Sequence, residues 1–324
     1  MPEDKKSADR SKRNQERMLK VISGAAEMEI WLKDLLRSGI LQLPQQNNEW
    51  FDKIRSRMTD AQATGLGNMV RELKELPYRK TDEWQSESAH IIAKLFLLVE
   101  GIRRLDELDA VTQADVRYLS GWSVNQKEIL EDVNVTNISD QWLHIARMTE
   151  LIEDITVQRN YLYGLRSGAF ALQINFAFRY APINSALFPG GVFEMDLAFV
   201  PSNMPLRAVI RKMGDEKSYL PEAIAMLPNF TALLAEMTRF RSKYPWADEY
   251  PFALAGISAL QIDNAFILKD KEGNCLGISD KFELMQCLHL LACTGGHPHN
   301  IFALFSGGKI IPLGIIGKRR YVLL

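Results

Sequence analysis

The sequence predicts an α+β protein, in which an N-terminal helical bundle is followed by an antiparallel β-meander within a mixed α+β half. Two patterns support this prediction. Up to about residue 136 the apolar residues recur every three or four positions, as in amphipathic helices. After Asn137 large apolar residues alternate with small or polar ones, as in half-buried strands. We therefore expect a flexible or helical linker over residues 1–14, a helical domain over 15–136 and an α+β domain over 137–324.

Composition places the chain among globular proteins. Of its 324 residues 47% are hydrophobic and 24% charged, which is enough to bury a large core. The net charge of -1 does not favour nucleic-acid binding. Three cysteines fit a reducing compartment better than a disulfide framework. The N-terminal segment lacks a signal-peptide core and no apolar run is long enough to span a bilayer, so we expect a cytoplasmic protein without a membrane segment.

Four helical patterns are expected in the first half, over residues 18–40, 59–76, 82–108 and 112–120. The second and fourth begin at capping-box pairs, Thr59 with Gln62 and Thr112 with Asp115. Gly121 follows the last pattern and is expected to close that helix. The third pattern is apolar around much of its circumference, which predicts a central place in the bundle.

The second half contains mainly strand and turn patterns. An antiparallel meander with one covered face is expected from strands over 170–178, 193–199 and 206–210. In the first strand the core-facing residues are expected to be Phe170, Leu172, Ile174, Phe176 and Phe178. A long helix over about 222–243 is expected to lie across the meander. Further short strands are expected over 252–260, 265–268, 301–305 and 309–313.

Several sequence phrases resemble a known family. In the first half these are EMEIWLKDLLRSGI from Glu27, DAQATGLGNMVRELKELP from Asp60, AKLFLLVEGIRRLDEL from Ala93 and QADVRYLSGW from Gln113. In the second half they are VQRNYLYGLRSGAFALQINFAF from Val157, LFPGGVFEMDLAFVPSNMPLRAVI from Leu187 and HLLACTGGHPHNIFALFSGGKIIPL from His289. Their order and spacing resemble the segment after the zinc motif of bacterial SWIM zinc finger family proteins, from roughly Gln15 to the C-terminus.

The zinc motif of that family is missing. It consists of a Cys-x-Cys pair followed by Cys-x-His, four ligands that suit tetrahedral zinc, and no cysteine occurs here before Cys275. Zinc-dependent binding is therefore not implied. The resemblance implies a bacterial adaptor module that serves beside a MoxR-type AAA ATPase and a von Willebrand factor A protein.

One stretch of the sequence combines residue types that can bind zinc, namely Cys287, His289, Cys293, His297 and His299. The alternative, which we favour, places both cysteines in the core as part of the apolar run LMQCLHLLAC. The two later histidines then lie in a turn that contains Gly and Pro. We accordingly assign no metal, cofactor or catalytic residue.

Other motifs also have structural interpretations. His144 could serve as a general base with Glu153 or Asp154 as its orienting partner, but such residues occur in every chain of this length. Gly65-Leu66-Gly67 lacks the strand that precedes a nucleotide loop, and close helix packing is expected there. The basic N-terminal residues alternate with acidic ones, as on a solvated helix face.

The leading functional hypothesis is a non-enzymatic protein-interaction or adaptor module with a protein partner and no cofactor. Two alternatives remain open. One is a nucleic-acid-associated remnant of a zinc-finger protein, which requires a one-sided basic surface. The other is a metal-dependent enzyme centred on residues 287–299.

Overall fold

The computed structural model describes residues 2–78, 83–179, 181–183, 185–219, 224–263 and 265–324, with side chains described from Lys12 onwards. It divides into two compact units, Met1–Val124 and Asn125–Leu324. The sequence analysis placed this division at residue 136. It falls earlier because the short helix α6 (Gln126–Glu131) contacts two strands of the second unit.

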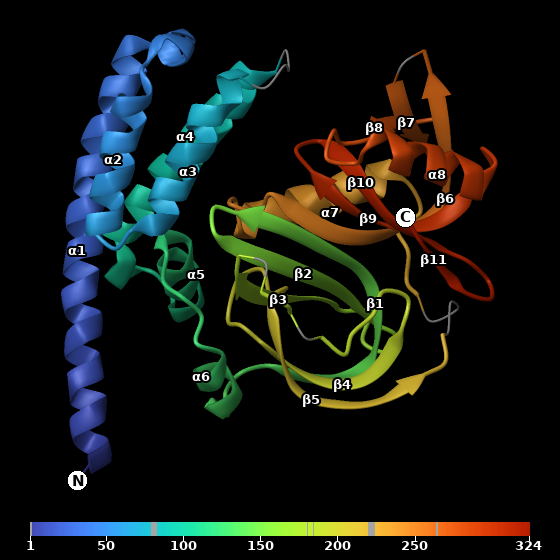
Figure 1. The fold of residues 1–324 in the computed structure, drawn as a ribbon, viewed down its shortest axis with the longest axis horizontal. Coiled ribbons are helices and arrows are strands. Elements are labelled where there is room, and N and C mark those ends of the chain that lie inside the picture. Colours follow the sequence, from blue (N-terminus) through green and yellow to red (C-terminus); the bar gives the residue numbers. More distant parts are fainter. Residues whose placement is uncertain (1, 79–82, 180, 184, 220–223, 264) are drawn as a thin grey trace. The chain divides into compact units, whose positions relative to one another are not determined.

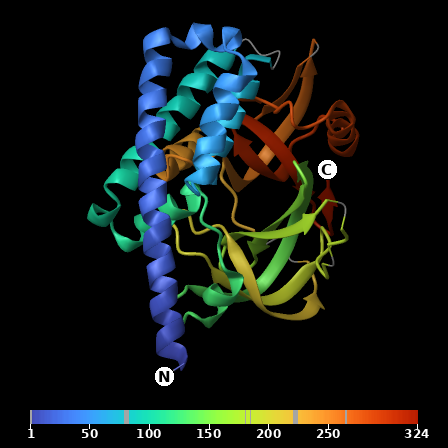
Figure 2. The same cartoon turned by 60° about the vertical axis from the view of Figure 1, so that its left-hand side comes forward.

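The first unit is a helical bundle (Figures 1 and 2). Its helices are α1 (Pro2–Ser38), α2 (Asn48–Asp60), α3 (Thr64–Glu75), α4 (Trp84–Arg103) and α5 (Ala110–Ser120). Short 3-10 segments are η1 (Ile40–Gln45), η2 (Leu76–Tyr78) and η3 (Leu105–Glu107). α4 contacts α1, α3 and α5, so it occupies the central place expected from its apolar circumference. α1 runs well past the ends of α2, α3 and α4 towards the N-terminus.

One face of each helix forms the bundle core. On α1 the buried residues are Val21, Ala25, Met28, Leu32 and Leu35. Ile22 and Leu36 belong to the same sequence pattern, yet they are 40% and 47% exposed. The sequence pattern included too many residues, because α1 carries apolar residues both on the face that packs against the bundle and beside that face.

Two expected helix starts are wrong. α2 was not expected, and it begins after Asn47, whose side chain accepts a hydrogen bond from the Trp50 amide at 2.9 Å. Thr59 therefore lies in the last turn of α2 and does not cap α3. α5 begins after Asp109, which accepts from the amides of Val111 and Thr112, so Thr112 is not its cap. Gly121 does close α5, in the left-handed conformation with φ +115°.

The first sheet of the second unit is antiparallel. Its strands are β1 (Asn137–Ile152), β2 (Ile155–Gly164), β3 (Phe170–Phe178), β4 (Val192–Phe199) and β5 (Ala208–Lys217), in the order β3-β2-β1-β4-β5. The expected direct meander of β3, β4 and β5 is wrong, because the unassigned strands β1 and β2 lie between β3 and β4. The amide of Leu172 at the start of β3 donates to the Leu206 carbonyl just before β5 at 2.7 Å. The sheet therefore curls so that its two edges meet at this point.

The second sheet has the order β11-β10-β9-β6-β7-β8. Its strands are β6 (Glu249–Ile262), β7 (Ala265–Lys269), β8 (Cys275–Gly277), β9 (His299–Ser306), β10 (Lys309–Ile316) and β11 (Tyr321–Leu323). Four of these were expected, whereas β8, β11 and the helix α8 (Leu284–Thr294) were not.

Helix α7 (Phe230–Lys243) is shorter than the expected helix over 222–243. Residues 222 and 223 lie outside the described residues, and residues 224–229 are not helical. Asn229 caps α7 by accepting from the Ala232 amide at 2.8 Å, directly after Pro228. Proline disfavours helix in the residue before it, which explains the late start.

Two apolar cores hold the second unit together. The larger one joins β1 and β2 to β6, β9 and β10 with α7, and its buried aromatic residues include Tyr163, Phe230, Phe252 and Phe302. The smaller one lies on the other face of the first sheet, around Trp142, Phe193, Met195 and Leu197. The expected orientation of β3 is wrong at its end, because Phe176 and Phe178 are 56% and 60% exposed. The α+β class, with helices first and antiparallel sheets after them, is confirmed.

Candidate functional site

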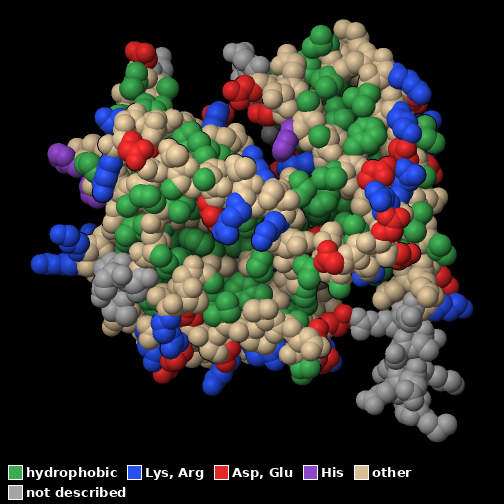
Figure 3. All heavy atoms as spheres, turned by 180° about the vertical axis from the view of Figure 1, so that it is seen from behind, with side chains coloured by type: hydrophobic (Ala, Val, Ile, Leu, Met, Phe, Trp, Pro, Cys, Tyr) green, Lys and Arg blue, Asp and Glu red, His purple; other side chains and the backbone are tan. Residues whose placement is uncertain are grey.

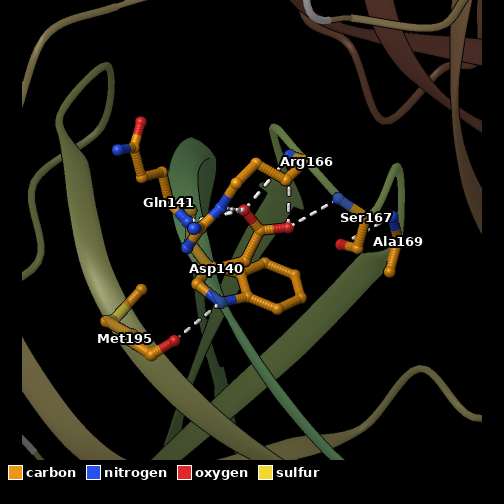
Figure 4. A network of polar contacts seen from close by, with 7 residues as sticks. Asp140, Gln141, Arg166, Ser167, Ala169 and Met195 are labelled. Atoms are coloured by element: carbon orange, nitrogen blue, oxygen red, sulfur yellow. Dashed lines mark hydrogen bonds and ion pairs between the residues drawn. The ribbon is translucent and has the colours of Figure 1, made fainter.

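Asp140 on β1 is a buried carboxylate, 1% exposed, that holds the turn between β2 and β3 (Figure 4). It accepts from the backbone amides of Arg166 at 3.1 Å and Ser167 at 2.7 Å. The Arg166 guanidinium adds an ion pair at 3.1 Å. Burial opposes ionisation of Asp140, but the hydrogen bonds from Ser167 and Arg166 outweigh it and hold its pKa below the usual value. Its oxygens are occupied by these donors, so Asp140 anchors the turn.

A second polar group crosses β1, β2 and β3. Arg147, Asn160 and Gln173 lie side by side in the strand register. The guanidinium of Arg147 donates to Asn160 Oδ1 at 2.9 Å, and Asn160 Nδ2 donates to Gln173 Oε1 at 2.7 Å. Arg147 also donates to Ser185 Oγ at 3.2 Å and to the Leu187 carbonyl, which ties the segment before β4 to the sheet. The row is thus a cross-strand clamp that joins three strands to one loop.

His144 is fully buried beside this row, where a bulge interrupts the pairing of β1 with β2. Its Nε2 lies 3.1 Å from the Ala146 carbonyl, which can only accept, so Nε2 carries the proton. Burial and the nearby Arg147 charge lower the pKa of His144 to about 4.

The structure does not assemble the general-base pair considered from the sequence. Glu153 and Asp154 follow β1 at its far end, about 30 Å away along an extended strand. Asp154 forms an ion pair with Arg179 at 3.2 Å. His144 is therefore a neutral buried histidine without either proposed partner.

The low pKa of His144 predicts acid sensitivity. Because the folded-state pKa lies below the ordinary value, His144 favours the folded state above about pH 6.5, and this contribution is lost as pH falls towards 4. Between pH 7 and pH 5, the loss of this contribution is expected to lower the free energy of unfolding by about 2 kcal/mol. Urea unfolding of the wild type and of His144→Gln at both pH values checks this. An equal loss in the two proteins would contradict it.

The five residues of the zinc-like stretch are dispersed. Cys287 is buried on α8 with its thiol 3.8 Å from the Phe282 carbonyl, and burial raises its pKa. His289 and Cys293 are exposed on α8, so the expected core position of Cys293 is wrong. His297 lies in the turn after α8, and its carbonyl is 2.9 Å from His299 Nδ1. In the described part of the chain no three His, Cys, Asp or Glu side chains come together as a metal site.

The exposed side of α8 carries three apolar residues. Leu284, Met285 and Leu288 are 62%, 72% and 43% exposed. The opposite side of the helix is buried through Cys287, Leu290 and Thr294. α8 contains no Lys, Arg, Asp or Glu. Core positions were predicted from the sequence for Cys287 and Cys293 in this run, whereas the structure buries only Cys287.

Elsewhere on the surface, charged residues of both signs are mixed with apolar residues. On the face shown in Figure 3, Lys and Arg side chains lie among Asp and Glu side chains, with apolar areas between them. Near the N-terminus Arg17 donates to the Gly121 carbonyl at 3.0 Å and lies 4.7 Å from the centre of the Trp122 ring. Arg17 therefore makes contacts within the bundle.

None of the described helices combines the length and the apolar character needed to cross a membrane.

Residues 16–119 match the family model described as the SWIM-associated four-helix bundle domain. The first unit is thus similar, over residues 16–119, to that bundle domain. This match confirms, over that span, the resemblance to the region after the SWIM zinc motif. No curated protein and no solved structure matches the chain. The matched residues end at position 119, so Asp140, Arg147 and α8 all lie in the second unit, outside the family match.

No function was predicted from the sequence for Asp140, Arg147 or Asn160. An Asp or Asn within a predicted strand could have indicated them, because these residue types are rare in strand interiors. When such a residue is buried there, it needs a hydrogen-bond partner. The assignment of β1 and β2 was missing, however, and without these strands the polar residues did not stand out.

Proposed function

We propose that this chain is a non-enzymatic protein-binding module whose second unit binds a protein partner through α8. The observation that carries the proposal is the exposed side of α8, formed by Leu284, Met285 and Leu288. Burying a large apolar side chain is worth about 1.5–3 kcal/mol, so a partner that covers these three residues gains substantial free energy. Contiguous exposed apolar residues of this kind are typical of protein-interaction sites.

The chemistry of α8 favours an apolar groove or helix on the partner. A helix without Lys, Arg, Asp or Glu offers no charged group for an ion pair across an interface. Its recognition would rest on apolar side chains at positions one, three and four residues apart, as in helix-in-groove complexes. From the resemblance stated above, we propose that the partner is a MoxR-type AAA ATPase or a von Willebrand factor A protein in a bacterial cytoplasm.

The polar groups of the second unit support a non-enzymatic role. Asp140 is committed to a turn, and Arg147 with Asn160 clamps three strands and a loop. His144 is fully buried and neutral. Each of these groups has a place in the fold that accounts for it without a substrate.

A binding experiment with matched variants tests the proposal. The tagged full chain is mixed with the purified MoxR-type ATPase and von Willebrand factor A protein of the same cell, and the dissociation constants are measured. Met285→Lys and Leu288→Lys are each expected to weaken binding at least about tenfold, because a charge would be buried in the interface. Val133→Lys, at an apolar residue that is 90% exposed elsewhere in the second unit, is the control and is expected to bind normally.

Two results would contradict the proposal. One is that neither protein binds the wild type. The other is that Met285→Lys and Leu288→Lys bind as tightly as Val133→Lys, which would place the contact on a surface other than α8.

A further inference from the structure

Strand β3 leaves half of its outer edge open. It stands at the end of the strand order and pairs with β2 on one side, in a register without a bulge. On the other side the Leu172 amide donates to the Leu206 carbonyl. Beyond Leu172, no described strand pairs with this edge. The segment Ile174–Phe178 therefore forms a free edge, except at the Phe178 carbonyl, which accepts from the Ala181 amide at 3.1 Å.

The backbone groups of this free edge point outward. The Leu172 amide points away from β2, and strand geometry repeats every two residues, so the amides and carbonyls of Ile174 and Phe176 point the same way. Among the described strands, none pairs with this side of β3 beyond the isolated bridge of Leu172 with Arg207. Ile174 and Phe176 therefore present their backbone groups on the side of β3 that no strand pairs with.

The sequence of β3 lacks the features that usually protect an edge strand. Proteins place Lys, Pro or a bulge on such edges to prevent pairing with another chain. The nine residues FALQINFAF contain no charge and no proline, and their register with β2 has no shift. None of these protecting features is therefore present within β3.

The side chains beside the edge are apolar on one face. Phe176 and Phe178 are 56% and 60% exposed, and Ile155, the register partner of Phe178, is 40% exposed. The charges nearby are paired, since Glu150 binds Arg159 and Asp154 binds Arg179. A second copy of this surface would therefore meet little electrostatic repulsion.

We propose that two copies of the chain pair through their β3 edges in an antiparallel, two-fold arrangement. A dyad at Phe176 places Phe176 opposite its counterpart and Ile174 opposite Phe178, so every facing pair on that side is apolar. Cross-strand aromatic and β-branched pairs of this kind stabilise sheets. The outward amide and carbonyl of Phe176 bond to the same residue of the second copy, which joins the two curled sheets. This surface is separate from α8, so the proposal does not depend on the proposed function.

Sedimentation of the full chain over a range of concentrations tests the dimer. The wild type is expected to show a reversible monomer–dimer equilibrium. Phe176→Pro removes the outward amide and the ring but leaves the bonds to β2, because proline is tolerated where the amide faces outward. Phe176→Lys places two like charges opposite each other at the dyad. Both variants are expected to weaken dimerisation at least about 100-fold.

Val133→Lys, at a residue that is 90% exposed and lies outside β3 and α8, is the control and is expected to dimerise like the wild type. Circular dichroism verifies that each variant is folded, and Phe176→Lys replaces Phe176→Pro if the latter unfolds. A wild type that stays monomeric up to about 0.1 mM would overturn the proposal. So would a dimer that is unaffected by folded Phe176→Pro or Phe176→Lys.

Discussion

Gly65→Ala is expected to destabilise the helical bundle of the first unit by about 3 kcal/mol, because the new methyl group has no room. A Cβ atom at Gly65 would lie 1.8 Å from the Leu119 carbonyl oxygen and 2.9 Å from the Ser120 carbonyl carbon. Both atoms belong to the backbone at the end of α5, so they cannot move aside as a side chain would. The start of α3 must therefore separate from α5.

Gly67→Ala in the same helix is the matched control. Its Cβ would lie 3.5 Å from Met58 Cβ, an ordinary contact, and alanine favours helix over glycine by roughly 0.5–1 kcal/mol. We expect this variant to be as stable as the wild type or slightly more stable. Urea unfolding followed by hydrogen exchange of residues 12–124 compares the two. Equal stability of Gly65→Ala and Gly67→Ala would contradict the close contact of α3 with α5.

Asp140→Ala is expected to destabilise the second unit by about 3–4 kcal/mol. The substitution leaves the buried amides of Arg166 and Ser167 without their acceptor, and it also removes the ion pair with Arg166. Asp154→Ala is the control, because its ion pair with Arg179 is exposed and is worth at most about 1 kcal/mol. Chemical unfolding reported by hydrogen exchange in residues 125–324 measures both.

Protonation of Asp140 is expected to cause a further loss of stability of the second unit in acid. The pKa of Asp140 is lower in the folded state, so its contribution is present above the unfolded-state pKa and disappears as pH falls through the folded-state value. The wild type is therefore expected to lose more unfolding free energy below about pH 4 than Asp140→Ala does. Parallel acid dependence of the two proteins would contradict the role of Asp140 as an ionised anchor.

Local sequence patterns predicted those helices and strands whose own residues show a clear apolar pattern. The α4 pattern is apolar around its circumference, and β9 and β10 are apolar runs joined by Gly307 and Gly308, so each was recognised. β1 and β2 were missed because their polar residues break the expected alternation. Those residues, Asp140 and Asn160 among them, are buried only because distant turns and strands supply partners.

Surface features were harder to predict than the core. In the run LMQCLHLLAC both cysteines were expected in the core, and in the strand FALQINFAF the alternate large residues from Phe170 to Phe178 were expected on the covered face. In the structure each has one buried and one exposed part, as Leu288 and Phe178 show. The period of a helix or strand tells which residues share a face, but the presence of a covering element depends on the tertiary fold. The exposed parts of α8 and β3 are the two surfaces for which we propose binding partners.

Site-specific photo-crosslinking tests the binding role of α8 most directly. A photoreactive amino acid replaces Met285, which is 72% exposed, and in a second protein it replaces Val133 as the control. After illumination of intact cells, the Met285 protein is expected to carry a crosslinked MoxR-type ATPase or von Willebrand factor A protein, identified by mass spectrometry, and the Val133 protein is not. Crosslinks to neither protein at Met285, or the same crosslinks at both positions, would contradict the proposal that α8 is the partner-binding surface.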